Sequence, residues 1–573
     1  MRLALAQLNP LVGDLAGNGE LILAASRQAA AQGADLVLTP ELSLWGYPPR
    51  DLLLRPSLIA KQGAVLNQLA ASLAKELPQL AVLVGMAEPS GAAPLPNLFN
   101  AVVLVEAGSW RVVARKRLLP TYDVFDEQRY FCAATGPSVL ELERGGRTWR
   151  LGLTICEDLW VEEELQGHRL AGADPVAELL SSRIDLLLNL SASPFGQAKV
   201  ALRQSLARRA ASRLACPVVY VNQVGGNDEL VFDGASFVVD ASGGVDAGSG
   251  VVSQLASCKE QVSCWEVNGA GPVASLPEAS LPTENEQLFR VLVLGVADYA
   301  RKCGFSSAVL GLSGGIDSAL VAVIAAAALG GERVQALMMP SPWSSDGSLR
   351  DAQALAGRLG LGCRTAEIAA LMASFDTALT PVLAGPPSGL SAENLQSRIR
   401  GTMLMAVANQ QGQLLLSTGN KSELAVGYCT LYGDMNGGLA VIGDLYKSSV
   451  FELCAWLDSA AAGPCRRELG LPGDGELVGR TIRDKPPSAE LRPDQLDSDS
   501  LPDYAVLDPI LKAYIEELAS PEQLIASGTP AELAERVMQL LRRAEFKRRQ
   551  APPLLKIGNR AFGSGWRMPI AAW

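Results

Sequence analysis

The sequence contains one histidine, His168, in 573 residues. Histidine supplies many zinc ligands and the general base of Ser–His–Asp triads. A metal centre built from several histidines is therefore excluded, and so are two independent histidine-dependent sites. Any catalysis in this chain must depend mainly on cysteine, carboxylates, lysine, serine or backbone groups.

Long apolar runs and paired cysteine motifs are also missing. The longest uninterrupted apolar run covers residues 319–329, whereas a membrane-spanning helix needs about 18 residues or more. The apolar stretch at residues 1–9 is too short for a signal peptide and predicts a first buried strand. Ten cysteines are scattered without a C-x-x-C pair, which argues against a zinc site and a disulfide scaffold. We therefore expect a cytoplasmic protein with no membrane partner.

The charge balance is acidic. Lysine and arginine total 49 and aspartate and glutamate total 60, so the net charge is −11. Such a chain lacks the general attraction to phosphate backbones on which nucleic-acid binders depend, so we expect no nucleic-acid partner. With 48 % hydrophobic and 19 % charged residues the chain is globular in composition, and its length suits two to four domains of roughly 100–200 residues.

Sequence patterns predict two α/β domains joined by a linker. In residues 1–267, short apolar runs alternate with helical stretches, which favours sheets covered by helices. Residues 268–283 are rich in glycine and proline and predict the linker. Residues 284–573 begin with the βαβ alternation typical of a doubly wound parallel sheet. Residues 473–504 carry little periodicity, and we interpret them as either a disordered segment or a functional lid.

A glycine-rich loop in the second domain predicts a nucleotide site. The loop follows an apolar strand at residues 308–310 and opens a long alanine-rich helix, so backbone N–H groups and the helix dipole can converge on an anion. The Walker pattern G-x-x-x-x-G-K-[ST] does not occur. Because Asp317 would repel phosphates unless a divalent cation lay between them, it is a candidate Mg²⁺ ligand. The candidate ATP-binding residues of this loop are Gly311, Leu312, Ser313, Gly314, Gly315, Ile316, Asp317 and Ser318.

The pattern S-G-G-x-D-S at residues 313–318 resembles the loop of the ATP pyrophosphatase family. Members of that family bind ATP, activate an oxygen as an AMP adduct, release pyrophosphate and admit nitrogen or sulfur. Further segments are similar to NAD synthetases, namely residues 391–401, 416–423, 428–435, 486–492 and 545–550. This resemblance implies ATP as co-substrate and Mg²⁺ as cofactor. It also implies an ATP contact at Thr418, metal ligands at Asp317 and Glu423, and deamido-NAD⁺ contacts at Asn394, Glu423 and Lys547.

In the first domain, Cys156 ends an apolar strand at residues 151–155. A thiol nucleophile there needs a base and a cation to lower its pKa and to stabilise an oxyanion. Glu41 and Lys116 stand at two other predicted strand ends, although each alone is typical of a solvated charge. Together, in the order Glu, Lys, Cys, the three residues resemble the nitrilase superfamily, whose αββα sandwich carries that triad. His168, 168 − 156 = 12 residues beyond Cys156, leaves a Cys–His pair as a less favoured alternative, because no third orienting group is evident.

Other stretches of this domain resemble the glutaminase domain of glutamine-dependent NAD synthetases, namely residues 45–49, 125–127 and 189–195. The resemblance implies that Tyr122, Ser193 and Lys199 contact glutamine and that Glu127 supports the triad. For the whole chain it implies a ligase that hydrolyses glutamine and then amidates adenylylated deamido-NAD⁺ with the ammonia released. Synthetase domains of this family pair, so we expect a homo-oligomer.

The residues alone support a thiol amidase fused to an ATP-dependent ligase, and other acceptors stay open. A relative of GMP synthetase would need histidine in its glutaminase, and a relative of asparagine synthetase would need an N-terminal cysteine that Met1 does not offer. A tRNA-modifying ligase would favour a basic surface. An inactive scaffold could keep both folds, although Cys156, Asp317 and Glu423 are all present.

Overall fold

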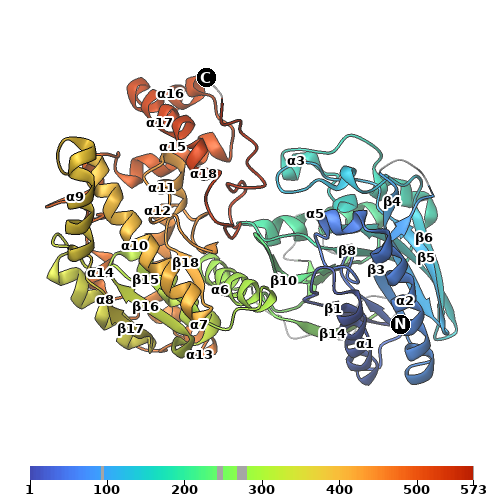
Figure 1. Ribbon diagram of the computed structural model, residues 1–573. Helices are drawn as coiled ribbons and strands as arrows, with labels where there is room; N and C mark the ends of the chain where they lie inside the picture. The colour runs from blue at the N-terminus through green and yellow to red at the C-terminus, as the bar shows by residue number, and fades with distance from the viewer. Residues whose placement is uncertain (92–95, 242–249, 268–280, 572–573) are drawn as a thin grey trace. The chain divides into compact units, whose positions relative to one another are not determined.

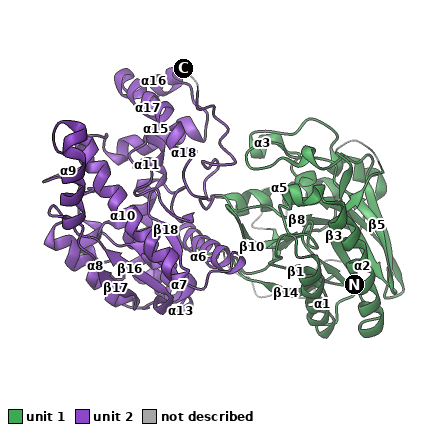
Figure 2. Cartoon of the chain, in the orientation of Figure 1, with its two compact units in different colours: residues 1–282 green, residues 283–573 purple. Residues whose placement is uncertain are grey.

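The computed structural model describes residues 1–91, 96–241, 250–267 and 281–571. The chain forms two compact units, residues 1–282 and 283–573 (Figure 2). Most of the predicted linker 268–283, namely residues 268–280, lies outside the described residues.

Two six-stranded sheets form unit 1 (Figure 1). The first has the strand order β14 (Gln261–Glu266), β1 (Arg2–Gln7), β2 (Leu36–Leu38), β3 (Ala81–Pro89), β4 (Leu98–Glu106) and β5 (Ser109–Arg115). The second has the order β13 (Val251–Gln254), β12 (Phe237–Val239), β9 (Val218–Asn222), β8 (Leu186–Ser191), β7 (Arg147–Ile155) and β6 (Ser138–Arg144). Three central strands of each sheet run parallel. A separate hairpin pairs β10 (Val224–Asn227) with β11 (Leu230–Asp233).

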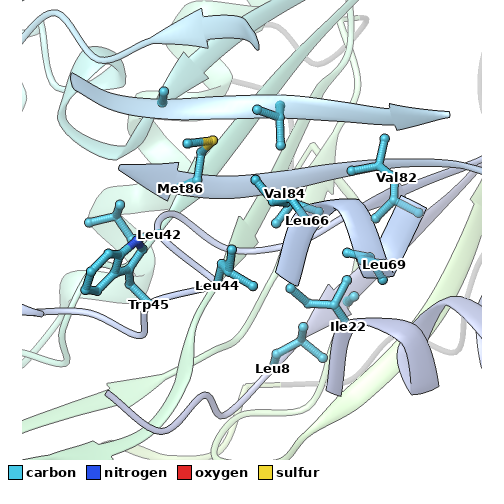
Figure 3. Close-up of a cluster of buried hydrophobic side chains, with 14 of the residues drawn as sticks. Leu8, Ile22, Leu42, Leu44, Trp45, Leu66, Leu69, Val82, Val84 and Met86 are labelled. Atoms are coloured by element: carbon cyan, nitrogen blue, oxygen red, sulfur yellow. The ribbon is translucent and has the colours of Figure 1, made fainter. Parts of the chain in front are cut away.

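Apolar packing arranges unit 1 in four layers. Leucines of both sheets share one buried cluster, so the sheets pack face to face. The helices α1 (Leu15–Ala31) and α2 (Pro56–Glu76) cover the first sheet, where Leu66 and Leu69 pack near Val82 and Val84 of β3 (Figure 3). The helix α5 (Lys199–Leu214) covers the second sheet. The expected αββα sandwich is confirmed, because helices cover the outer face of each sheet and the inner faces pack on each other. Each sheet has apolar side chains on both faces, and both faces must be buried.

Unit 2 contains a five-stranded parallel sheet (Figure 1). Its order is β17 (Gly362–Thr365), β16 (Val334–Met338), β15 (Ala308–Gly311), β18 (Leu414–Ser417) and β19 (Leu439–Ala440). The chain therefore moves outward from β15 in one direction and then returns to its other side at β18. Ligands of such sheets bind at the carboxyl ends of the strands where the order reverses, so the fold places a site at the ends of β15 and β18.

Helices surround this sheet. Most of α7 (Ile316–Leu329) is buried, which explains the longest apolar run of the sequence. The helices α8 (Asp346–Leu359) and α10 (Leu390–Gln411) contact the strands, and α6 (Glu284–Lys302) and α12 (Lys447–Leu457) pack on α7. A second apolar cluster joins α11 (Lys421–Val426), α15 (Tyr504–Ile515), α16 (Pro521–Ala526) and α17 (Ala531–Arg543). The shorter helices are α3 (Glu163–Gln166), α4 (Pro175–Glu178), α13 (Gly463–Glu468), α14 (Arg480–Arg483) and α18 (Glu545–Arg548).

Residues 473–504 are folded and contain α14 and a short 3₁₀ turn, Asp497–Asp499. The segment is therefore ordered, which argues against the disordered alternative. That it acts as a lid stays a prediction. Within the described part of the chain, no helix combines the length and the hydropathy that crossing a membrane requires.

Candidate active sites

Glu41, Lys116 and Cys156 lie at the ends of β2, β5 and β7, as the sequence predicts. The Lys116 ammonium donates to Glu41 Oε1 at 2.7 Å, and both side chains are buried. Asn100 also donates to Glu41 Oε1 at 2.7 Å, and the Ala192 backbone N–H donates to Oε2 at 3.1 Å. Glu41 is thus held by three donors in one orientation.

Glu127 completes the arrangement on the other side of Lys116. Lys116 Nζ donates to Glu127 Oε1 at 2.8 Å, and the Tyr47 hydroxyl donates to the same oxygen at 2.7 Å. Burial alone would lower the pKa of Lys116, but the Glu127 and Glu41 carboxylates hold it well above its usual value. Burial raises the pKa of Glu127 to about 7. The lysine therefore stays charged between two carboxylates.

Cys156 begins a 3₁₀ turn and has a positive φ of 45°. A non-glycine residue in this region is strained by about 1–3 kcal/mol and persists only where its surroundings fix it. Burial and the Glu41 carboxylate raise the pKa of the Cys156 thiol well above its usual value, whereas Lys116 lowers it. Cys156 is therefore a protonated thiol before substrate binds, and nucleophilic attack requires a base. Glu41 is the candidate base, because its charge acts on the Cys156 thiol.

The three predicted glutamine contacts, Tyr122, Ser193 and Lys199, come from three separate segments of unit 1. The Tyr122 hydroxyl donates to Glu157, the residue after Cys156, at 3.0 and 3.1 Å. Burial raises the pKa of Glu157 to about 7. Lys199 begins α5 with its ammonium over the Trp160 ring, 5.5 Å from the centroid. The buried Ser193 is fixed by its backbone N–H, which donates to Asn222 at 2.8 Å.

His168 is exposed, and its ring lies edge-to-face against Tyr122 at a centroid distance of 4.9 Å. The buried Cys156 thiol instead has its pKa shifted by Glu41 and Lys116. This arrangement favours the Glu–Lys–Cys interpretation over the Cys–His alternative.

Unit 2 has a cavity of about 290 Å³ at the carboxyl ends of β15 and β18. Seven of the eight predicted loop residues line it, all except Gly314, and so do Thr418 and Glu423. Residues 485–490 of the segment 473–504 line it as well. The position agrees with the strand reversal described above, so the chain topology and the cavity identify the same site.

The loop conformation explains its glycine and serine content. Gly314 has φ +80°, and a Cβ there would lie 2.2 Å from the Ser348 carbonyl oxygen. The Ser318 hydroxyl donates to the Gly315 carbonyl at 3.0 Å, and the Gly315 N–H donates to Ser313 Oγ at 3.2 Å. These contacts hold the loop open at the start of α7, where helix N–H groups bind anions.

A buried lysine also joins two carboxylates in this site. Lys447 Nζ pairs with Asp317 and lies 3.5 Å from Glu423 Oε1. Burial and Asp317 raise the pKa of Glu423 to about 8. Asn420 donates to Asp317 Oδ1 at 3.0 Å and forms a reciprocal capping box with Glu423 at the start of α11. Both predicted metal ligands therefore face one cavity.

These donors fit Mg²⁺ only with help from a substrate. Among the residues that the structure describes, no three His, Cys, Asp or Glu side chains are grouped to hold a metal ion. Mg²⁺ is commonly bound by one or two carboxylates together with substrate phosphates. Asp317 and Glu423 provide the two carboxylates, with hard oxygen donors of the required kind.

Asn394 and Lys547, predicted to contact deamido-NAD⁺, do not line this cavity. Asn394 Oδ1 accepts a hydrogen bond from Thr430 at 2.8 Å. Lys547 Nζ donates to the carbonyls of Gly427 and Cys429 at 2.8 and 2.7 Å. Both side chains thus brace the loop at residues 427–430.

Three cavity residues were not assigned from the sequence. Lys447 pairs with Asp317, Lys485 donates to the Gly314 carbonyl at 3.1 Å, and Asp497 accepts from the Tyr504 hydroxyl at 2.9 Å. The capping spacing N-x-x-E at residues 420–423 could have located the start of α11. No comparable local signal marks Lys485 or Asp497, because both depend on how the segment 473–504 folds back.

Comparisons with known proteins agree with this geometry. Residues 2–254 match the carbon-nitrogen hydrolase family, and residues 288–551 match the NAD synthase family. The chain is 50 % identical to a glutamine-dependent NAD(+) synthetase of Synechocystis sp., covering 99 % of this chain and 98 % of the relative. It is 40 % identical to the enzyme of that name from Thermotoga maritima, covering 100 % and 98 %.

A solved structure gives the same result. The glutamine-dependent NAD+ synthetase from Acinetobacter baumannii, in complex with adenosine diphosphate, is 36 % identical and covers 99 % of this chain and 98 % of that chain with a TM-score of 0.74. With these matches along both units, the chain belongs to the glutamine-dependent NAD(+) synthetase family.

Proposed function

We propose that this enzyme converts deamido-NAD⁺ to NAD⁺ with ATP and with ammonia released from glutamine. The observation that carries the proposal is the presence of two sites in one chain. Unit 1 holds the buried Glu41–Lys116–Cys156 group, and unit 2 holds the glycine-rich loop beside a cavity.

In unit 1, Glu41 takes the thiol proton and Cys156 Sγ attacks the side-chain carbonyl carbon of glutamine. Lys116 and a backbone N–H of the turn after Cys156 stabilise the tetrahedral oxyanion. Ammonia leaves and a thioester remains, which water activated by Glu41 hydrolyses to glutamate. Tyr122, Ser193 and Lys199 are the proposed contacts of glutamine.

In unit 2, the loop N–H groups and Thr418 bind the phosphates of ATP. The nicotinate carboxylate of deamido-NAD⁺ attacks the α-phosphorus, and pyrophosphate leaves. Ammonia then attacks the acyl carbon, and AMP leaves. Asn394, Glu423 and Lys547 are the proposed contacts of deamido-NAD⁺. Asn394 and Lys547 also brace the loop at residues 427–430. A relative solved in complex with adenosine diphosphate supports nucleotide binding by this enzyme.

Asp317 and Glu423 are the proposed ligands of Mg²⁺, which would neutralise phosphate charge beside them. Lys447 keeps the two carboxylates together. Without a cation or a lysine, two carboxylates facing one cavity would repel each other and the phosphates alike.

We propose that the enzyme works in the cytoplasm on small-molecule substrates, and its ten free cysteines are typical of a reducing compartment. We also propose a homo-oligomer. The helix α9 (Ala369–Leu383) has no buried residue, although Leu371, Phe375 and Val382 are exposed apolar side chains on it. A second copy of the chain could cover this face.

Product analysis tests the proposal directly. The enzyme is incubated with Mg-ATP and deamido-NAD⁺, once with glutamine and once with an ammonium salt. We expect NAD⁺, AMP and pyrophosphate from both nitrogen sources, and glutamate from the first. NAD⁺ from ammonium alone would contradict the amidase assignment. Hydrolysis of glutamine without NAD⁺ from either source would indicate a different acceptor.

A further inference from the structure

Arg400 is a basic residue of the unit 2 cavity that the steps above do not use. It lies on α10 and lines the cavity, and its side chain is half-buried. Its Nε donates to the carbonyl of Met339, the residue after β16, at 3.1 Å. Its two Nη groups form no hydrogen bond or ion pair with the residues that the structure describes.

The other two basic residues that line the cavity within the described chain have carboxylate partners. Lys447 pairs with Asp317, and Lys485 pairs with Asp351 at 2.8 Å. A guanidinium stays charged at neutral pH, and burying a charge is unfavourable unless a group of opposite sign compensates it. The guanidinium of Arg400 therefore indicates that the cavity takes an anion beside α10.

Glu490 is the carboxylate whose charge acts on Arg400, but it does not fill this role. Burial lowers the pKa of Arg400, and the Glu490 carboxylate offsets only part of this effect. Glu490 Oε1 instead accepts hydrogen bonds from the hydroxyls of Ser345 and Ser348, at 3.0 and 2.6 Å. Most of the charge of Arg400 thus remains to be balanced by a ligand.

The fold places Arg400 opposite the glycine-rich loop. Right-handed crossovers put α7 and α8 on one face of the sheet, and the return of the chain from β17 to β18 puts α10 on the other face. Both α7 and α10 contact β15. One turn after Arg400, Leu404 lies 3.3 Å from the position that a Cβ at Gly311 would occupy. A triphosphate bound at the start of α7 can therefore reach across the end of β15 toward Arg400.

We propose that Arg400 binds the α-phosphate of ATP and stabilises its charge during adenylylation. This inference rests on the proposed function, which puts ATP in this cavity. The two Nη groups can donate to two non-bridging oxygens of the α-phosphate. A carboxylate oxygen of the acceptor forms the bond to the α-phosphorus. The bond from that phosphorus to the bridging oxygen breaks, and its electron pair leaves with pyrophosphate.

The acceptor carboxylate is the other anion that comes close to the α-phosphorus. A carboxylate held by a guanidinium is a weaker nucleophile, because the cation stabilises the electron pair that must form the new bond. The α-phosphate carries its charge on oxygens that do not react, so Arg400 can hold them throughout the step. The chemistry therefore favours the phosphate as the partner of Arg400.

The test measures binding without turnover, by calorimetry with Mg²⁺ and one ligand at a time, namely AMP, pyrophosphate or deamido-NAD⁺. Arg400→Gln removes the charge but keeps an N–H donor for the Met339 carbonyl. We expect its Kd for AMP to rise about tenfold, because a charge-assisted contact is lost. The Kd values for pyrophosphate and deamido-NAD⁺ should stay within about twofold of wild type.

Steady-state assays of the same variants complete the test. The kcat of NAD⁺ formation from ammonium should fall about 100-fold in Arg400→Gln, as when one donor to a developing charge is removed. Glutamine hydrolysis should keep its wild-type rate. Arg400→Lys keeps the charge without the planar pair of donors and should recover part of the affinity for AMP. Arg333→Gln is the matched control, since Arg333 is exposed and precedes β16 at the end away from the cavity.

The outcomes separate the hypotheses. An unchanged Kd for AMP in a folded Arg400→Gln would overturn the proposal. So would a rise confined to pyrophosphate or to deamido-NAD⁺, which would assign Arg400 to a different anion. Equal weakening of AMP binding in Arg400→Gln and Arg400→Lys, together with a loss of unfolding free energy, would indicate a structural role and overturn it too. If wild type forms no NAD⁺ from ammonium, the proposed function itself fails, and that result appears without any variant.

Discussion

The two sites of this chain use the same buried motif for different purposes. In unit 1, Lys116 joins Glu41 and Glu127, and in unit 2, Lys447 joins Asp317 and Glu423. The side chains of the first group are 0–4 % exposed, whereas Asp317 and Glu423 are 17 % and 18 % exposed. The charges of the first group are therefore paired within the protein. The second group faces a cavity, so a bound cation or substrate can change its charge pairing.

This difference suits the two reactions. Hydrolysis of an amide needs a base and a cation held in fixed positions before the substrate arrives. Adenylylation brings several phosphate charges and a divalent cation into the site. A site whose charges were already fully paired would have to break those pairs before it could bind them. A lysine that holds two carboxylates at the wall of a cavity can exchange partners when these charges enter.

Replacing each lysine should give the largest difference in stability between the two sites. Lys116→Met leaves Glu41 and Glu127 buried without their cation, and removing one partner of a buried pair costs about 3–5 kcal/mol. Glutamine hydrolysis should be lost. Lys447→Met should cost clearly less stability, because Asp317 and Glu423 can be reached by water and cations from the cavity. Denaturant unfolding of both variants measures the difference. Equal destabilisation by the two would contradict the distinction.

The pH dependence of the unfolding free energy should show the effect of burying a carboxyl group in the closed site of unit 1. The pKa of Glu157, beside Cys156, is about 7 rather than 4.5, so folding favours its protonated form. Its contribution is fully present below pH 4.5 and is lost as the pH rises through 7. The shift corresponds to about 3 kcal/mol at most. Glu157→Gln should flatten the change of unfolding free energy between pH 4.5 and 7, measured by urea titrations at several pH values. A slope equal to that of wild type would rule out this origin.

A substitution in the loop should have a smaller effect that is confined to unit 2. In Gly314→Ala, the new Cβ would meet the Ser348 carbonyl at 2.2 Å in a backbone conformation with φ +80°. Strain of this kind costs about 1–3 kcal/mol. We expect the KM for ATP to rise about tenfold while glutamine hydrolysis keeps its wild-type rate, as steady-state assays of the two half-reactions would show. Gly357→Ala, a position where a Cβ meets no atom within 4 Å, is the control.

Much of the fold follows from local patterns in the sequence. The longest apolar run, residues 319–329, lies in the mostly buried helix α7, because a continuous apolar surface is stable only in the interior. The Glu–Lys–Cys positions were accessible because each residue follows a strand that local patterns predict. That β2 and β5 belong to one sheet and β7 to the other could not be predicted, since it depends on how the two sheets pack. Lys447, Lys485 and Asp497 were not assigned, since Lys447 reaches the cavity from the start of α12 and the other two from the segment 473–504, and both positions depend on tertiary packing.

At some positions, the neighbouring sequence suggests an environment that differs from the one in the structure. Lys547 lies among basic residues and is bound to two backbone carbonyls, an arrangement that no sequence pattern distinguishes from a surface charge. The composition of residues 473–504 permitted disorder, yet hydrogen bonds such as that of Gln396 to the Leu491 carbonyl at 2.8 Å hold the segment against α10.

The central claim is that one chain carries two separable active sites, and a crossed pair of variants tests it most directly. Cys156→Ala and Asp317→Asn are each assayed for glutamine hydrolysis and for NAD⁺ formation from ammonium. We expect Cys156→Ala to lose only the first activity and Asp317→Asn to lose the second while still hydrolysing glutamine. Loss of both activities in a folded Cys156→Ala, or full ammonium-driven synthesis by Asp317→Asn, would contradict the account.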